Sequence, residues 1–294
     1  MVDRADDRVK GSERLGNLLG WALPLAVLVA LGIRTVAYVR RFTVDVLYWD
    51  QWGFLEPLFR GAGAWAQFDW QHGPHRQGVG GLLLAWVLGA SGWSIRAEAL
   101  VSALIVIAAA ALAWATLRRA TGAASWTDVC APLLCLGSGL EEIFVGPSNP
   151  AHGPVPMALV FAVALCWTLR SPAPRALLCG LLGGLCTFTG FGLFVGLLHP
   201  VLFGAEWFHS RGDAHRRRAA TLGLVLSALA LLVFFWGWRF STAVDCFRFP
   251  HPRPLEYLDY LGLLLCRPLG MDRLGAQGKL DFLEERRLNL FRRQ

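Results

Sequence analysis

The stretch AEALVSALIVIAAAALAWATL, residues 97–117, determines the fold class that we expect for this chain. It is mostly apolar and has the length of about 20 residues that a helix needs to cross the roughly 30 Å core of a bilayer. A helix pairs its own backbone groups in lipid, whereas a lone strand leaves them unpaired. The stretch therefore predicts a membrane-spanning helix.

The composition of the whole chain indicates the same environment. Hydrophobic residues make up 55% of the 294 residues and charged residues 17%, and the mean hydropathy is +0.45. These values are too apolar for a soluble domain. The formal net charge is +7, but the arginines form short clusters between apolar segments, so we expect no nucleic-acid partner. The seven cysteines include no CxxC pair, so we expect neither a disulfide framework nor a zinc site.

Apolar stretches recur along the chain and predict an all-α, polytopic transmembrane bundle over residues 1–270, followed by a charged tail at 271–294. About seven spans are predicted, at residues 18–39, 97–117, 127–145, 155–169, 176–188, 192–207 and 220–240. The fifth and sixth share one apolar run that is too long for a single span and is interrupted by TFTGFG, Thr187 to Gly192. The apolar segment 79–93 is short and rich in glycine, and whether it crosses stays open.

Arginine clusters between the predicted spans give the orientation, because arginine-rich loops remain in the cytoplasm. The clusters are Arg118 with Arg119, Arg170 with Arg175, and Arg211 with Arg216, Arg217 and Arg218. The polar loop 40–78 then lies outside, and we expect a multi-pass protein of the cytoplasmic (inner) membrane. If the N-terminus is cytoplasmic, all of these clusters lie in the cytoplasm only if segment 79–93 does not cross the membrane. If the segment crosses, the chain has eight spans, and one arginine cluster or the N-terminus must lie on the other side of the membrane.

The outer loop contains two aromatic segments, DQWGFLEPLFRG at 50–61 and AGAWAQFDW at 62–70. Tryptophan favours the headgroup level of a bilayer. The segments therefore predict short juxtamembrane helices that lie on the membrane with their apolar faces down.

Two motifs of this loop are candidates for chemistry. In YWDQW, residues 48–52, Asp50 is a candidate base for a hydroxyl acceptor, with Trp52 as a substrate contact; the alternative is an ordinary loop aspartate near the headgroups. In QHGPHR, residues 71–76, His72, His75 and Arg76 are candidates to hold a lipid-linked phosphate. The alternatives are interfacial anchoring by Arg76, or a metal on the HxxH pair. Gly73 and Pro74 and the lack of a nearby third ligand disfavour the metal.

Carboxylates near the outer end of the span 127–145 form a third candidate. Glu141 and Glu142 precede the loop GPSNPAHGP and lie close enough to the end of the span to be hydrated. We expect Glu141 to assist substrate binding at most.

The order of these features resembles a known family. The chain resembles the N-terminal half of bacterial membrane glycosyltransferases of the GT-C fold. The resemblance lies in the order of one span, the loop YWDQWGFLEPLFRG, the segment QHGPHRQGVGGLLLAWVLGASGWSIRAEAL and a span ending in RR. That group includes protein O-mannosyltransferases, lipid A sugar transferases and uncharacterised members with an Asp-Asp-Trp and a His-Asn-Glu-His-Arg-like motif. The resemblance implies a catalytic aspartate in the first outer loop, matched here by Asp50, and a histidine-arginine motif matched by His72, His75 and Arg76.

The resemblance also implies the reaction. The expected function is inverting transfer of a sugar from a polyprenyl-phosphate donor to a lipid, glycan or protein acceptor, without a metal or cofactor. A transporter or lipid flippase with its site at the break Thr187 to Gly192 is one alternative. A non-catalytic, degenerate or truncated membrane protein is another, because Gln51 replaces the second acidic residue of the family motif and the chain ends soon after the last predicted span.

Overall fold

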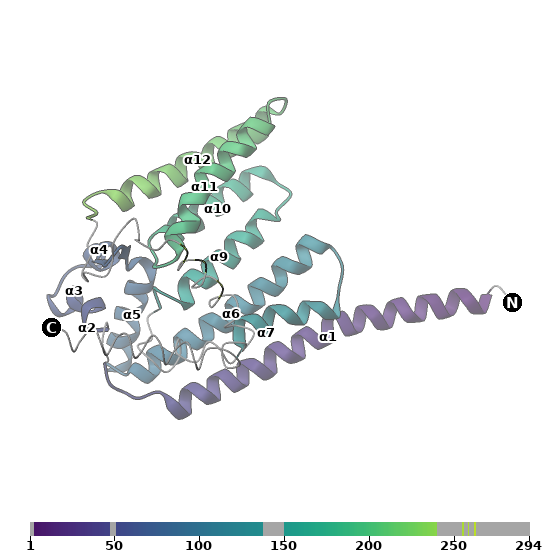
Figure 1. Ribbon diagram of the computed structural model, residues 1–294, viewed down its shortest axis with the longest axis horizontal. Helices are drawn as coiled ribbons and strands as arrows, with labels where there is room; N and C mark the ends of the chain where they lie inside the picture. The colour runs from purple at the N-terminus through teal and green to yellow at the C-terminus, as the bar shows by residue number, and fades with distance from the viewer. Residues whose placement is uncertain are drawn as a thin grey trace. The chain divides into compact units, whose positions relative to one another are not determined.

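The computed structural model describes residues 3–47, 51–137 and 150–239, and the isolated positions 255, 258 and 262. These residues are mostly helical and include one short β-hairpin (Figure 1). The candidates Asp50 and Glu141 and the charged tail 271–294 lie outside the described residues.

Three helices have the length and composition needed to cross a membrane. They are α1 (Asp3–Phe42), with its apolar part at Leu18–Phe42, α6 (Ile95–Thr121) and α12 (Ala214–Phe235). The three apolar parts contain 25, 27 and 22 residues, which is enough for a bilayer core of roughly 30 Å. They coincide with the predicted spans at 18–39, 97–117 and 220–240. The three helices indicate a multi-pass membrane protein.

The predicted spans 155–169, 176–188 and 192–207 overlap shorter helices, and so does the described part of 127–145, which ends at residue 137. These helices are the 3-10 helix η1 (Trp126–Val129) with α7 (Cys130–Leu136), α9 (Pro154–Trp167), α10 (Pro172–Thr187) and α11 (Gly192–His209). α9 and α10 contain 14 and 16 residues, fewer than the roughly 20 of a simple span. The count of about seven spans therefore stays a prediction.

Helix α6 is tied to the end of α1 through a shared cap. Ser94 is the N-cap of α6, and its side chain accepts a hydrogen bond from the Ala97 backbone N–H. Asp45, three residues beyond α1, accepts a hydrogen bond of 2.6 Å from the Ile95 backbone N–H. This carboxylate satisfies a backbone N–H that has no partner within the helix. The segment 43–94 therefore starts and ends at the same end of the bundle, and helix α5 (Gly78–Ser91) within it does not carry the chain to the other end.

The second half of the chain forms a packed group of helices in which α9 contacts α10, α10 contacts α12 and α11 contacts α12. Glycines allow close approach: a Cβ on Gly183 would lie 2.0 Å from Nδ1 of His199, and one on Gly223 would lie 2.4 Å from the Phe203 ring. The chain turns between α10 and α11 at residues 188–191, within the predicted TFTGFG break.

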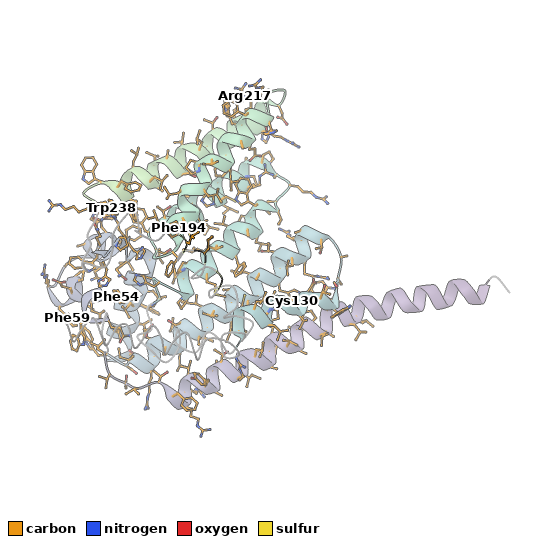
Figure 2. All side chains as sticks on the ribbon, viewed as in Figure 1. Phe54, Phe59, Cys130, Phe194, Arg217 and Trp238 are labelled. Carbon is orange, nitrogen blue, oxygen red and sulfur yellow. The ribbon has the colours of Figure 1, made fainter. Side chains whose placement is uncertain are left out.

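The basic turns of α10 to α12 lie opposite the outer loop. Figure 2 shows Arg217, at the start of α12, far from Phe54, Phe59 and Trp238 at the other end. The guanidinium of Arg217 lies 4.2 Å from the ring centroid of Trp207, and Arg175 pairs with Glu206. Arginine and tryptophan together suit the interface of a membrane.

Arg34, the charge inside the first predicted span, is held by the protein. An arginine within an apolar helix commonly reaches the membrane surface by snorkelling. In the structure the guanidinium of Arg34 donates a hydrogen bond of 2.8 Å to the carbonyl of Leu136. It thus satisfies a carbonyl at the C-terminus of α7.

Candidate functional site

The loop between α1 and α5 contains three short helices that pack on the bundle: α2 (Gln51–Phe54), α3 (Glu56–Phe59) and α4 (Ala64–Asp69). Phe54 and Leu55 of the loop are buried against Leu84 and Leu88 of α5 and Ile95 of α6. The predicted short helices are therefore present, with an apolar face that is covered by the protein's own helices. Whether they also touch lipid stays a prediction.

The motif QHGPHR forms a hairpin of β1 (Gln71–His72) and β2 (His75–Arg76). His72 pairs directly with His75 across the two-residue turn. Gly73 has a φ of +59°, as tight hairpin turns require. The motif therefore forms a tight turn and not a regular helix.

A third histidine, His152, joins the hairpin from the turn before α9. Its ring centroid lies 5.3 Å from that of His75 and 6.4 Å from that of His72. Phe54 stands edge-on to both His72 and His152, at 4.5 Å and 5.0 Å. We call His72, His75 and His152 the histidine cluster.

Two close backbone approaches place His152 there. A Cβ on Gly80 of α5 would lie 2.3 Å from the Ala151 Cα, so only glycine fits at this position. The Gly190 backbone N–H, in the turn between α10 and α11, donates a hydrogen bond of 2.9 Å to the Ala151 carbonyl. From the same turn, the ring of Phe191 lies 5.9 Å from that of His75. The break in the long apolar run thus forms one wall of the site.

Burial favours the uncharged forms of His152 and His75. It lowers the pKa of His152 to about 3, with a smaller contribution from His75 and His72. Burial likewise lowers the pKa of His75, again with a contribution from His72. Nδ1 of His75 and Nε2 of His152 are buried without a hydrogen-bond partner among the described residues. A neutral imidazole nitrogen can accept a hydrogen bond from a hydroxyl group or donate one, depending on its tautomer.

No arrangement of histidine, cysteine and acidic side chains suited to a metal ion occurs among the residues that the structure describes. The cluster is therefore interpreted as a set of hydrogen-bonding groups.

Arg76 has protein partners on all three of its nitrogens. Nε donates to the Phe234 carbonyl at 2.8 Å, and Nη2 donates to the Trp236 carbonyl at 2.6 Å. Nη1 donates to the Asp69 carbonyl at 2.6 Å and lies 2.7 Å from the Asp69 carboxylate. The Arg76 side chain is only 4% exposed. These bonds use four of the five N–H donors of Arg76, so Arg76 is held mainly by the protein itself.

The end of α12 holds the hairpin as well. The Trp238 indole N–H donates a hydrogen bond of 3.1 Å to the Pro74 carbonyl, and the Arg239 backbone N–H donates one of 3.1 Å to the Gln71 side chain. The hairpin is therefore fixed to a helix that lies about 160 residues further along the chain.

The other predicted residues lie apart from the histidine cluster or outside the described chain. Trp52 is 57% exposed, and its ring packs at 5.9 Å on Phe59. Gln51, at the start of α2, is buried. Asp50 and Glu141 lie outside the described residues, so their expected roles stay predictions.

Sequence reasoning missed His152 and the pairing of Asp69 with Arg76. Both were visible in the sequence, as a histidine in the loop GPSNPAHGP and as an acid just before the hairpin. Local spacing indicates only partners that are close to His75 in the chain, whereas His152 comes from a distant segment. The sequence does contain one indication: the loop that contains His152 is predicted to lie on the same side of the membrane as the loop that contains His75.

Comparisons with protein-family models, with curated proteins and with solved structures found no match to this chain. The fold and the site define it as a mostly helical, multi-pass membrane protein with a cluster of three half-buried histidines at one end of its helices.

Proposed function

We propose that the chain is a membrane glycosyltransferase that moves a sugar from a polyprenyl-phosphate donor to a hydroxyl group of a lipid, glycan or protein. The reaction would take place at the outer face of the cytoplasmic membrane. The observation that carries the proposal is the histidine cluster, because imidazole N–H groups can donate hydrogen bonds to a phosphate. Sugar transfer from a prenyl phosphate releases such a phosphate.

The location of the cluster supports the outer face. The cluster belongs to the loop end of the helices, whereas the basic turn before α12 lies at the opposite end (Figure 2). Basic loops favour the cytoplasm, so the loop end is the extracytoplasmic one in this proposal.

The roles are divided among the residues of the loop. Asp50 accepts the proton of the acceptor hydroxyl while the acceptor oxygen bonds to the anomeric carbon and the bond from that carbon to the prenyl phosphate breaks. His72 and His75 donate hydrogen bonds to the departing phosphate. Arg76 positions the hairpin that carries both histidines, because its bonds to Phe234, Trp236 and Asp69 fix the guanidinium on the protein. Trp52 and Glu141 are further substrate contacts in this proposal.

The experiment tests Asp50 in the full chain. Membranes from bacteria that express it receive undecaprenyl phosphate carrying radiolabelled glucose, and label in new lipid, glycan or protein products is counted. Asp50→Asn is expected to abolish transfer while the protein still inserts. Asp213→Asn is the matched control, because Asp213 is a carboxylate that caps α12 at the opposite end of the helices, and this variant is expected to keep full activity.

Three results would contradict the proposal. Full transfer by Asp50→Asn would remove its catalytic residue. Movement of the labelled lipid across sealed vesicles without a new glycosyl product would instead indicate a flippase or transporter. Failure of the purified chain to bind the prenyl phosphate would indicate a non-catalytic protein.

A further inference from the structure

A pocket of about 270 Å³ lies beside Arg76, between α4 and the end of α12. Its lining consists of two tryptophans, one carboxylate and two aliphatic side chains: Trp65, Trp236, Asp69, Leu232 and Val233. The volume is slightly below the roughly 300–1,000 Å³ of pockets for drug-sized ligands, so the pocket suits a single small ring.

The two tryptophans offer open aromatic faces. Trp65 is 63% exposed and Trp236 is 85% exposed, although large aromatic side chains are usually well covered. The face of an indole ring is electron-rich and attracts the weakly positive C–H groups on the face of a sugar ring. Two such side chains at one pocket therefore fit a ring with apolar faces and polar edges.

Asp69 supplies the polar group. One of its carboxylate oxygens lies 2.7 Å from Nη1 of Arg76, and the other has no hydrogen-bond partner within the described ranges. A carboxylate oxygen accepts hydrogen bonds from hydroxyl groups. Because Arg76 balances its charge and none of the lining side chains is cationic, the pocket favours neutral hydroxyls over a phosphate.

The two aliphatic side chains of the lining belong to a helix that could cross a membrane. Leu232 and Val233 lie in the last turn of α12, one of the three helices that could cross a bilayer, and are 67% and 40% exposed. A hydrocarbon chain attached to the ring can continue along this helix into the lipid. The pocket thus combines an apolar side on a helix that could cross a bilayer with a carboxylate that can accept hydrogen bonds from hydroxyl groups.

We propose that the pocket of Trp65, Asp69 and Trp236 binds the neutral sugar ring of a glycolipid, with the hydrocarbon chain of the ligand along Leu232 and Val233. This deepens the proposed function by naming a neutral glycolipid as a substrate class. The proposed binding of a glycolipid does not depend on the proposed function; only the use of the bound sugar in a transfer reaction does. Binding is measured without any transfer, so failure of one proposal leaves the other open to its own test.

The probe is octyl β-glucoside with a photoreactive diazirine in its octyl chain, added below its micellar concentration to the full chain in lipid nanodiscs. Cross-linked peptides are identified by mass spectrometry over a range of probe concentrations. We expect saturable labelling of the peptides that contain residues 65–69 and 232–236. Unlabelled octyl glucoside should compete for the site and octyl sulfate should not, because the sulfate lacks hydroxyl groups and carries a negative charge.

Variants of the pocket distinguish binding of the probe in the pocket from non-specific partitioning of the probe into the membrane. Trp65→Ala and Trp236→Ala should each weaken binding about tenfold, the loss expected for one aromatic contact of about 1.4 kcal/mol. Both side chains are largely exposed, so these variants are expected to fold. Trp86→Ala, which removes a tryptophan of α5 that is 67% exposed and does not line the pocket, should bind as the parent does. Equal labelling in all three variants, or equal competition by octyl sulfate, would overturn the proposal.

Discussion

The guanidinium of Arg76 donates a hydrogen bond of 2.6 Å to the backbone carbonyl of Trp236, which lies 160 residues away in the sequence. With its bonds to Phe234 and Asp69, this contact ties the outer-loop hairpin to the end of α12. Arg76 follows His75 in the hairpin, and its partners Asp69 and Trp236 line the pocket. We therefore expect the loss of Arg76 to disturb both sites.

Removal of Arg76 is expected to destabilise the protein strongly. Arg76→Ala leaves the carbonyls of Phe234 and Trp236 and the Asp69 carboxylate without their partner, at a cost of roughly 3–5 kcal/mol for a broken buried pair. Arg76→Lys should recover only part of this loss, because an ammonium group cannot reach partners in three directions as the planar guanidinium does. Thermal unfolding in detergent measures the effect.

Arg60→Ala is the matched control for this prediction. Arg60 pairs with Glu56 one helical turn away, and their side chains are 67% and 39% exposed. An exposed pair contributes about 0–1 kcal/mol, so little change is expected. Similar unfolding temperatures for Arg76→Ala and Arg60→Ala would contradict the role given to Arg76.

The histidine cluster should make the protein less stable in acid. The pKa of His152 is about 3 in the folded protein and about 6.5 in an unfolded chain. Between these values the unfolded state binds more protons, so the free energy of unfolding falls as the pH is lowered through 6.5. For His152 alone the loss between pH 7 and pH 5 is at most about 2 kcal/mol.

His152→Phe tests the origin of this acid sensitivity. Phenylalanine keeps a ring beside Phe54 and His75 but cannot be protonated. The variant should lose less stability than the parent between pH 7 and pH 5, as measured by thermal unfolding at each pH. The lowered pKa of His75 acts in the same direction, so some sensitivity should persist. An unchanged slope in His152→Phe would show that the sensitivity arises elsewhere.

Gly78, at the start of α5, is expected to tolerate no side chain. Its φ is +54°, and a Cβ there would lie 1.9 Å from the Phe188 carbonyl oxygen. Gly78→Ala should therefore lower the unfolding temperature and separate α5 from the turn between α10 and α11. Cross-linking between cysteines introduced near residues 79 and 188 would report that separation.

Gly89→Ala provides the comparison within the same helix. No atom lies within 4 Å of a Cβ built there, and alanine is favoured over glycine in a helix by about 1 kcal/mol. This variant should be as stable as the parent or more stable. Equal destabilisation by both substitutions would contradict the close approach at Gly78.

The sequence by itself determined the class of elements in this protein. Hydropathy and helix length are properties of contiguous residues, so the long apolar helices α1, α6 and α12 could be predicted from the chain alone. The break near Gly190 and the non-helical turn at Gly73 and Pro74 were predictable for the same reason, because glycine and proline act on the local backbone.

Only the tertiary structure decided what surrounds the candidate residues. It placed His152 beside His75, surrounded Arg76 with the carbonyls of α12, and joined Trp65 and Trp236 in one pocket. These neighbours come from segments far apart in the chain, and they meet because glycines such as Gly78 and Gly80 let backbones approach closely. Such contacts depend on how whole helices pack, which no local pattern of residues specifies.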